Sequence, residues 1–246
     1  MLVVLTAAPG CAVGLESTTT EATPSAAPVS ASASPEMPLY GANVVNLAGT
    51  APSCTKRIQG SGFAYSPDRV LTTAHTVAGT EGPITVTASD GKRHEGHVVV
   101  FDPRKDVAVL RVPGLDADFL NFDSIEPGDR ATFAAYSKDG KLTVRSGEAG
   151  PPTTAHVNDI YNERTVKREV LVLQAAIDPG MSGAPLFGPG EEVVGMLFAA
   201  NLSDAGTGYV LTTGEIARPA ADGLNATKPV STRECDRSPV RGRRRR

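Results

Sequence analysis

The chain has 246 residues, of which 40% are hydrophobic and 25 are glycine. That length suits one globular domain rich in turns and is too short for a further sizeable module. The net charge of −3 hides an asymmetry. The segment from Ser231 onward holds seven arginines and two acidic residues, a balance of +5, so the rest carries −8. No aromatic residue interleaves with these arginines, which argues against a specific nucleic-acid binder.

The first ten residues, 1–10, are too short to span a bilayer and lack the cationic start of a signal peptide. We interpret them as the remnant of an export or membrane segment. Cys11 follows Ala8, Pro9 and Gly10, an order loosely similar to a bacterial lipoprotein cleavage site, although proline is unfavourable there. Cys11 is therefore either a lipid-anchor site or a thiol without function.

Residues 11–38 are predicted to form a disordered tether. From Glu16 to Pro38 the composition is Ser, Thr, Ala and Pro with almost no large apolar residues, so the segment cannot bury enough surface to fold. Residues 237–246 form a basic tail, for which a solvated, disordered end and a weak electrostatic contact with anionic lipid or polymer both remain open. The folded domain is expected over residues 39–236.

Short β-branched or alternating runs recur between these ends, separated by turn residues. Asp90-Gly91 is a strong hairpin signal, and Thr212–Glu215 resembles a helix capping box. Many short strands at near-regular spacing predict an all-β barrel or sandwich. The predicted strands include Ala42–Leu47, Gly62–Tyr65, Ile84–Ala88, His97–Phe101, Asp106–Val112, Ala131–Tyr136, Leu142–Ser146, Val166–Leu173, Ala184–Phe187, Val193–Ala199 and Gly208–Thr212.

Ser182 lies in Asp178–Pro185, D-P-G-M-S-G-A-P, where flanking glycines present a hydroxyl on a tight turn. A hydroxyl is a poor nucleophile unless a base and an orienting acid assist it. His75, at the end of a T-T-A-H sequence, supplies an imidazole. Asp106, which opens the apolar run D-V-A-V-L, supplies a carboxylate. The three residues together indicate nucleophilic catalysis by a serine.

These motifs resemble those of the trypsin/chymotrypsin-fold serine proteases: T-A-A-H, D-[IV]-A-[LV]-L and G-x-S-G-x-P, in the order His, Asp, Ser. The Gly60–Phe63 sequence and the placement of the cysteines are most similar to the bacterial membrane-anchored periplasmic branch of the actinobacterial acid-resistance type. The resemblance covers roughly residues 40–236. It implies two six-stranded antiparallel β-barrels with the active site between them and a short C-terminal helix.

The resemblance also implies a role for each motif residue. Ser182 attacks an acyl carbon, His75 moves the proton and Asp106 fixes the imidazole. The backbone N–H groups of Gly180 and Ser182 form the oxyanion hole. Plainer interpretations exist, with His75 a satisfied interior histidine and Asp106 a surface acid that opens a strand. Asp102 is the competing carboxylate and is expected to form a turn.

The other histidines carry little signal. His94 and His97 have a weak metal-like spacing, but they flank a hairpin strand, and a solvated face is favoured for them. His156 is expected in a loop. We therefore expect no metal and no cofactor.

Two residues depart from the commonest serine motif of the resembled family. Met181 replaces the usual aspartate and cannot pair with a newly cut N-terminus, which excludes activation of that kind, and Ala184 replaces a second glycine. By the same resemblance, Ala176 lies in the specificity pocket and supplies no buried anion, so a small or apolar substrate side chain is expected there. The remaining expected pocket residues are Phe198, Ala199, Ala200 and Gly208.

The chain has three cysteines. The resemblance implies a disulfide between Cys54 and Cys235 that ties the C-terminal segment to the first barrel. Its loop of about 180 residues corresponds to a few kcal/mol in the chain-entropy account. Two unpaired buried thiols are the alternative.

We therefore predict a serine endopeptidase that acts on polypeptides outside the cytoplasm, in the periplasm or cell envelope or as a secreted protein. It is expected to be a monomer, with a possible membrane tether through the N-terminal segment and no nucleic-acid partner. Two alternatives remain. One is a catalytically silent pseudoprotease that serves as a binding or scaffold module, with Met181 marking a collapsed oxyanion loop. The other is an esterase-type hydrolase that uses the same residues.

Overall fold

The computed structural model describes residues 40–201 and 203–234. The predicted remnant (1–10), tether (11–38), basic tail (237–246) and both Cys11 and Cys235 lie outside the described residues. Within the described ranges, no helix is long and apolar enough to cross a membrane.

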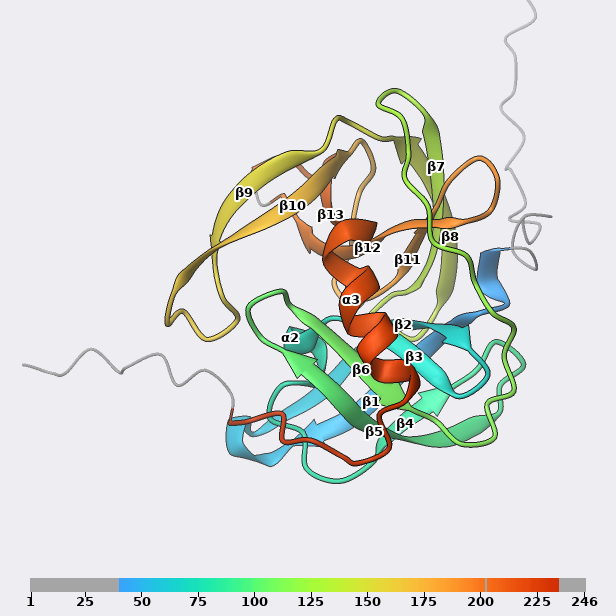
Figure 1. Ribbon diagram of the computed structural model, residues 1–246, viewed down its shortest axis with the longest axis vertical. Helices are drawn as coiled ribbons and strands as arrows, with labels where there is room; N and C mark the ends of the chain where they lie inside the picture. The colour runs from blue at the N-terminus through green and yellow to red at the C-terminus, as the bar shows by residue number, and fades with distance from the viewer. Residues whose placement is uncertain (1–39, 202, 235–246) are drawn as a thin grey trace, which may run out of the picture. The chain divides into compact units, whose positions relative to one another are not determined.

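The first half forms a closed antiparallel barrel with the strand order β1-β2-β3-β6-β5-β4 (Figure 1). The Asp90-Gly91 hairpin is confirmed: it joins β4 to β5, and Gly91 has a φ of +83°, in the region that glycine favours. The barrel elements are β1 (Val44–Ala51), η1 (Pro52–Cys54), β2 (Lys56–Ser66), β3 (Arg69–Thr72), α2 (Ala74–Val77), β4 (Ile84–Thr87), β5 (Arg93–Asp102) and β6 (Val107–Arg111).

The second half differs from the expected second six-stranded barrel. Its strands form a seven-stranded sheet in the order β8-β7-β11-β12-β13-β10-β9, and a second closed barrel is not shown among the described strands. The extra strand, β9, forms the edge of this sheet and, among the described strands, pairs with β10 alone. The elements are β7 (Arg130–Tyr136), β8 (Leu142–Glu148), β9 (Thr153–Asn158), β10 (Thr165–Leu173), β11 (Pro185–Phe187), β12 (Val193–Ala200), β13 (Gly208–Thr212) and α3 (Thr213–Leu224).

One apolar cluster joins the two halves and α3. Phe63 and Val109 come from the first barrel, Val193 and Met196 from the second sheet, and Ile216 from α3. Figure 1 shows α3 in red, in front of strands from both halves, and it contacts β5 and β6 as well as β12 and β13. Because buried apolar surface cannot separate without exposure to water, this cluster fixes how the two halves face each other.

The predicted late helix is confirmed as α3, but the capping box is wrong. The Thr212 hydroxyl donates to the Glu169 carboxylate at 2.9 Å and makes no cap bond to the helix. Glu215 accepts from the backbone N–H of Glu169 and pairs with Lys105 at 2.8 Å. Tertiary partners have therefore replaced the local cap. At the other end of the helix, the Arg69 guanidinium donates to the carbonyls of residues 223 and 224 in the last turn.

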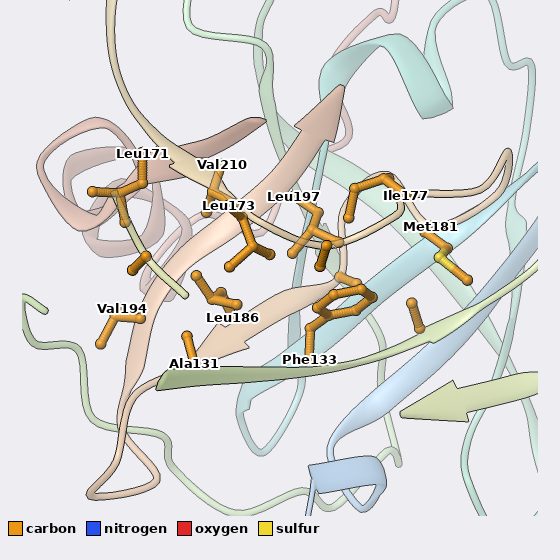
Figure 2. Packing of buried hydrophobic residues seen from close by; sticks show 14 of the residues in the cluster. Ala131, Phe133, Leu171, Leu173, Ile177, Met181, Leu186, Val194, Leu197 and Val210 are labelled. Atoms are coloured by element: carbon orange, nitrogen blue, oxygen red, sulfur yellow. The ribbon is translucent and has the colours of Figure 1, made fainter. Parts of the chain in front are cut away.

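Met181 belongs to the core of the second sheet and is fully buried. Figure 2 shows its sulfur-bearing side chain in the same packed layer as Phe133, Leu197 and Ile177. The Met181 sulfur also accepts the backbone N–H of Asp178 at 3.3 Å. The residue before the predicted nucleophile is therefore held by apolar packing, in a place where an ionised side chain would have no partner in this cluster.

We expect Met181→Asp to lower the free energy of unfolding by about 3–5 kcal/mol, since it buries a charge without a partner. Met181→Leu keeps the apolar volume and is expected to cost less than about 1.5 kcal/mol. Urea unfolding followed by circular dichroism measures both variants. Equal midpoints for the two variants would contradict the packing role.

Candidate active site

His75 is positioned by a short helix that follows β3. It lies in α2, whose other residues, Ala74, Thr76 and Val77, are buried. Packing of these three side chains holds the helix in place. The Thr73 and Thr76 hydroxyls bond each other at 2.7 Å. The imidazole is left half-exposed at the end of the first barrel.

Asp106 sits immediately before β6 and is 3% exposed. Its carboxylate accepts two bonds from His75: the backbone N–H donates to Oδ1 at 2.9 Å, and Nδ1 lies 2.8 Å from Oδ2. Asp106 has a φ of +63°, a left-handed conformation uncommon for a non-glycine residue. Such strained residues cluster at functional sites, where the surroundings hold them in place.

Ser182 lies on a tight turn between β10 and β11, and two glycines make that turn possible. Gly180 has a φ of +99° and Gly183 a φ of +91°. A Cβ at Gly180 would lie 2.7 Å from the backbone nitrogen of Lys138, and one at Gly183 would collide with the Ser61 carbonyl. Both positions therefore need glycine for space as well as for conformation.

Ser61 fastens this turn to the first barrel, a role that the sequence analysis missed. Its side chain is fully buried, and its hydroxyl donates to the Gly180 carbonyl at 2.9 Å and accepts the backbone N–H of Tyr136 at 2.9 Å. The Ser61 N–H donates to the Ser182 carbonyl at 3.1 Å, and its own carbonyl accepts the Thr72 hydroxyl at 2.7 Å. One residue thus links β2, β3, β7 and the turn that carries Ser182.

His75 and Ser182 line one cavity of about 540 Å³. Among the described residues no hydrogen bond joins them. The Ser182 hydroxyl is oriented toward the Phe198 carbonyl at 3.5 Å. Rotation about χ1 redirects a serine hydroxyl at little cost, and such bonds are often long in proteins without a bound substrate.

The two expected oxyanion donors are free of other partners. Within the described residues, neither the N–H of Gly180 nor that of Ser182 donates a hydrogen bond. The Pro179 carbonyl accepts the backbone N–H of Lys138 at 2.9 Å. Since the N–H of Gly180 belongs to the same trans peptide and points opposite to that carbonyl, the bond turns it away from Lys138.

Arg168, from β10, is a second partner of Asp106 that the sequence analysis also missed. It is 4% exposed, and its Nη1 lies 3.7 Å from Asp106 Oδ2. Its Nε donates to the Arg104 carbonyl at 2.9 Å, and its guanidinium carbon lies 5.7 Å from the centre of the Phe198 ring. Nη2 has no hydrogen-bond partner among the described residues. A buried cation thus sits directly behind the Asp106–His75 pair.

The pKa of His75 reflects this environment. Partial shielding of the imidazole from water lowers its pKa, but the charge of Asp106 and the hydrogen bond to it raise the pKa above the usual 6.5. The Arg168 cation opposes that rise. The carboxylate and the guanidinium therefore push the proton affinity of one imidazole in opposite directions.

Four of the five expected specificity residues lie on β12 and β13. The fifth, Ala176, lies in the segment between β10 and β11. Ala176 is exposed, and its carbonyl accepts the Arg145 guanidinium at 2.8 Å. Gly208 opens β13, and a Cβ there would collide with the Ile177 side chain. Ile177, rather than Ala176, therefore contacts Gly208, a neighbour that the sequence analysis did not identify. The other expected residues are Phe198, Ala199 and Ala200, all on β12.

The remaining candidates take structural positions. Asp102 accepts the backbone N–H groups of Arg104 and Lys105, as expected for a turn former. His94 and His97 lie three residues apart on β5, so their side chains point to opposite faces of the strand. His156 is on β9, so its expected loop position is wrong. In the part of the chain that the structure describes, no group of three or more His, Cys, Asp or Glu side chains could hold a metal.

Comparison with known proteins decides the family. The trypsin-like peptidase domain family matches residues 60–196, which include His75, Asp106 and Ser182. The chain belongs to the trypsin-like peptidase family.

Curated relatives of this trypsin-like chain are named serine proteases. Serine protease Rv3671c of Mycobacterium tuberculosis is 39% identical over 196 residues, which cover 78% of this chain and 49% of that protein. The chain thus spans about half the length of that relative. A probable periplasmic serine endoprotease, DegP-like, of Chlamydia pneumoniae is 29% identical over 150 residues, 59% of this chain and 29% of that protein.

Solved structures agree with the trypsin-like fold. The crystal structure of Rv3671c protease from M. tuberculosis in its active form has a TM-score of 0.77 at 38% identity, covering 82% of this chain and 88% of that one. Its inactive form has a TM-score of 0.67 at 35% identity, covering 76% and 91%. The HtrA-type protease AlgW with a tripeptide shares the fold, with a TM-score of 0.65 at 22% identity, covering 77% of this chain and 62% of that one.

We expect Arg168→Met to raise the pKa of His75, because it removes a cation that disfavours the imidazolium. The imidazole acts as a base only above its pKa, so the acidic limb of kcat/KM against pH should move to higher pH. Arg168→Lys keeps the charge and should leave the limb near its wild-type position. Arg218→Met, at an exposed arginine on α3, is the matched control. An unmoved limb in Arg168→Met would contradict the electrostatic role.

Proposed function

We propose that this chain is a serine endopeptidase that cleaves peptide bonds through Ser182, His75 and Asp106. The observation that carries the proposal is the 2.8 Å contact between His75 and Asp106, with His75 on the wall of the cavity that Ser182 also lines. The pair fixes the tautomer: the bond from Nδ1 to the carboxylate leaves Nε2 as the base.

The reaction then follows the chemistry of these groups. The Ser182 Oγ attacks the scissile carbonyl, and its proton passes to His75 Nε2. The resulting imidazolium is stabilised by Asp106. It then gives that proton to the departing amine, which leaves an acyl-enzyme on Ser182. Water then attacks the acyl-enzyme with His75 again as base. His75 returns the proton to Ser182 Oγ as the ester bond breaks, and the acid product leaves.

The developing oxyanion needs donors that are already in place. The free N–H groups of Gly180 and Ser182 are such donors, and one donor of this kind is worth about 2.7–4 kcal/mol in the barrier. The greater similarity to the active form of Rv3671c than to its inactive form supports a turn that is assembled at rest. The buried Met181 supports the same conclusion, because packing, and not a cut N-terminus, holds the turn.

The acyl-side pocket is proposed to take a small or apolar side chain. The buried Ile177 side chain contacts Gly208, and Ala176 brings no charge. These contacts support the preference expected from the sequence.

The proposed disulfide Cys54–Cys235 is supported by the path of the chain near its described end. Thr232 accepts the Tyr161 hydroxyl at 2.9 Å, and the Arg233 guanidinium carbon lies 5.6 Å from the centre of the Tyr161 ring. Tyr161 lines the same cavity as Ala51 and Lys56, which flank η1, and Cys54 ends η1. The C-terminal segment therefore runs toward the part of the first barrel that carries Cys54. Cys235 itself lies outside the described residues.

Action outside the cytoplasm completes the proposal. The DegP-like relatives are named periplasmic, and the proposed disulfide fits an oxidising compartment. A membrane tether through the N-terminal segment and a monomeric state belong to the same proposal.

Labelling with a fluorophosphonate probe tests the nucleophile. We expect wild type to be labelled at a single site, because only an activated serine attacks the probe. Ser182→Ala should abolish labelling and His75→Ala should slow it at least about 100-fold, the lower end of general-base contributions. Ser89→Ala, at an exposed serine of the first half, is the control and should label like wild type. Silence of folded wild type would favour the pseudoprotease alternative.

A further inference from the structure

The cavity beside Ser182 and His75 extends to the N-terminal part of β2. There it is lined by Lys56, Arg57 and Gln59, and Tyr161 also lines the cavity. None of its lining residues is acidic. An adjoining cavity of about 560 Å³ shares Arg57 and Gln59 and adds Lys138, again without an acidic lining residue.

These three cations are available to a ligand. In the described part of the chain no ion pair involves Lys56, Arg57 or Lys138, whereas Lys92, Lys105 and Arg145 each pair with a carboxylate. All three are exposed. On a body that carries an excess of negative charge, they give this end of the cavity the opposite sign.

The position of the cavity relative to the triad identifies which part of a substrate enters it. The residues expected to hold the substrate side chain before the scissile bond, Phe198–Ala200, do not line this cavity. It therefore opens on the other side of Ser182. His75, which protonates the departing amine, lies on its wall. The segment that follows the scissile bond would therefore lie along Lys56–Gln59.

The backbone of β2 provides an edge for that segment. Residues 56–60 pair with β1 on one side, but β3 pairs with β2 only from Phe63 onward. Within the described residues no strand covers the second edge of Lys56–Gly60. An extended peptide can add to such an edge through main-chain hydrogen bonds, with its side chains alternating between the two faces.

We propose that this surface is a subsite for the leaving-group segment and prefers acidic side chains, aspartate or glutamate, in the first three residues after the scissile bond. The proposal rests on the proposed function and names its substrate class. Lys56 and Arg57 supply the attraction near Ser182, and Lys138 extends it toward later residues.

The test compares quenched fluorescent peptides that share one acyl-side sequence and carry Glu, Gln or Lys at each of the three leaving-side positions in turn. At one or more positions kcat/KM should be about three- to tenfold higher for Glu than for Gln, and lowest for Lys. The preference should shrink at 0.5 M NaCl, where the Debye length is only about 4 Å.

The double variant Lys56→Gln, Arg57→Gln should bring the Glu-to-Gln ratio close to one. The matched control is Lys92→Gln, Arg93→Gln, which removes the same charge from the β4–β5 hairpin and should keep the wild-type ratio. A nitroanilide with the same acyl side has no leaving-side residues and reports only the proposed catalytic function. Cleavage of the nitroanilide with equal rates for Glu and Gln peptides would overturn the subsite alone. The proposed function would be overturned if the fluorophosphonate probe does not label the protein and the protein cleaves neither the peptides nor the nitroanilide.

Discussion

The rest of the candidate site depends on the hydrogen bonds by which Ser61 holds the Ser182 turn against the first barrel. His75 and Asp106 belong to the first barrel, whereas Ser182 lies between strands of the second sheet. A shift of 1 Å between the halves is enough to lower the rate of such a reaction strongly. Ser61 opposes that shift with bonds to Gly180, Ser182 and Tyr136, all made by a fully buried residue. The apolar cluster that includes α3 holds the same two halves from behind.

A second constraint concerns charge. Asp106 is nearly inaccessible to water, and a buried carboxylate is stable only when hydrogen bonds or cations compensate it. His75 and Arg168 both do so, but with different consequences for the base. The carboxylate strengthens the affinity of His75 for a proton, and the guanidinium weakens it. Asp106 thus orients the imidazole, and Arg168 limits how far the carboxylate raises the pKa of His75.

The sequence predicted the parts whose signals are local. The serine turn, the T-T-A-H and D-V-A-V-L motifs, the Asp90-Gly91 hairpin and most strands depend on a few neighbouring residues, and each is visible in the sequence. Ser61 and Arg168 were missed because their roles depend on partners 75 and 62 positions away, Tyr136 and Asp106, and neither has a local signature. The predicted capping box was wrong for the same reason. The Thr212 side chain bonds to Glu169 and the Glu215 side chain pairs with Lys105, and both partners are distant in the sequence. The second barrel was expected by resemblance, and the described pairing gives an open seven-stranded sheet.

The central claim is that Ser182 meets a base and an oxyanion hole that are both formed at rest. A crystal structure of the protein with a peptide boronate tests this most directly, because boron forms a tetrahedral adduct that resembles the reaction intermediate. We predict a covalent bond from Ser182 Oγ to boron, with a boronate oxygen within about 3.1 Å of the N–H groups of both Gly180 and Ser182. The Pro179–Gly180 peptide should keep its bond to Lys138. A structure in which the boronate is absent from Ser182, or in which that peptide must flip to admit it, would contradict the account.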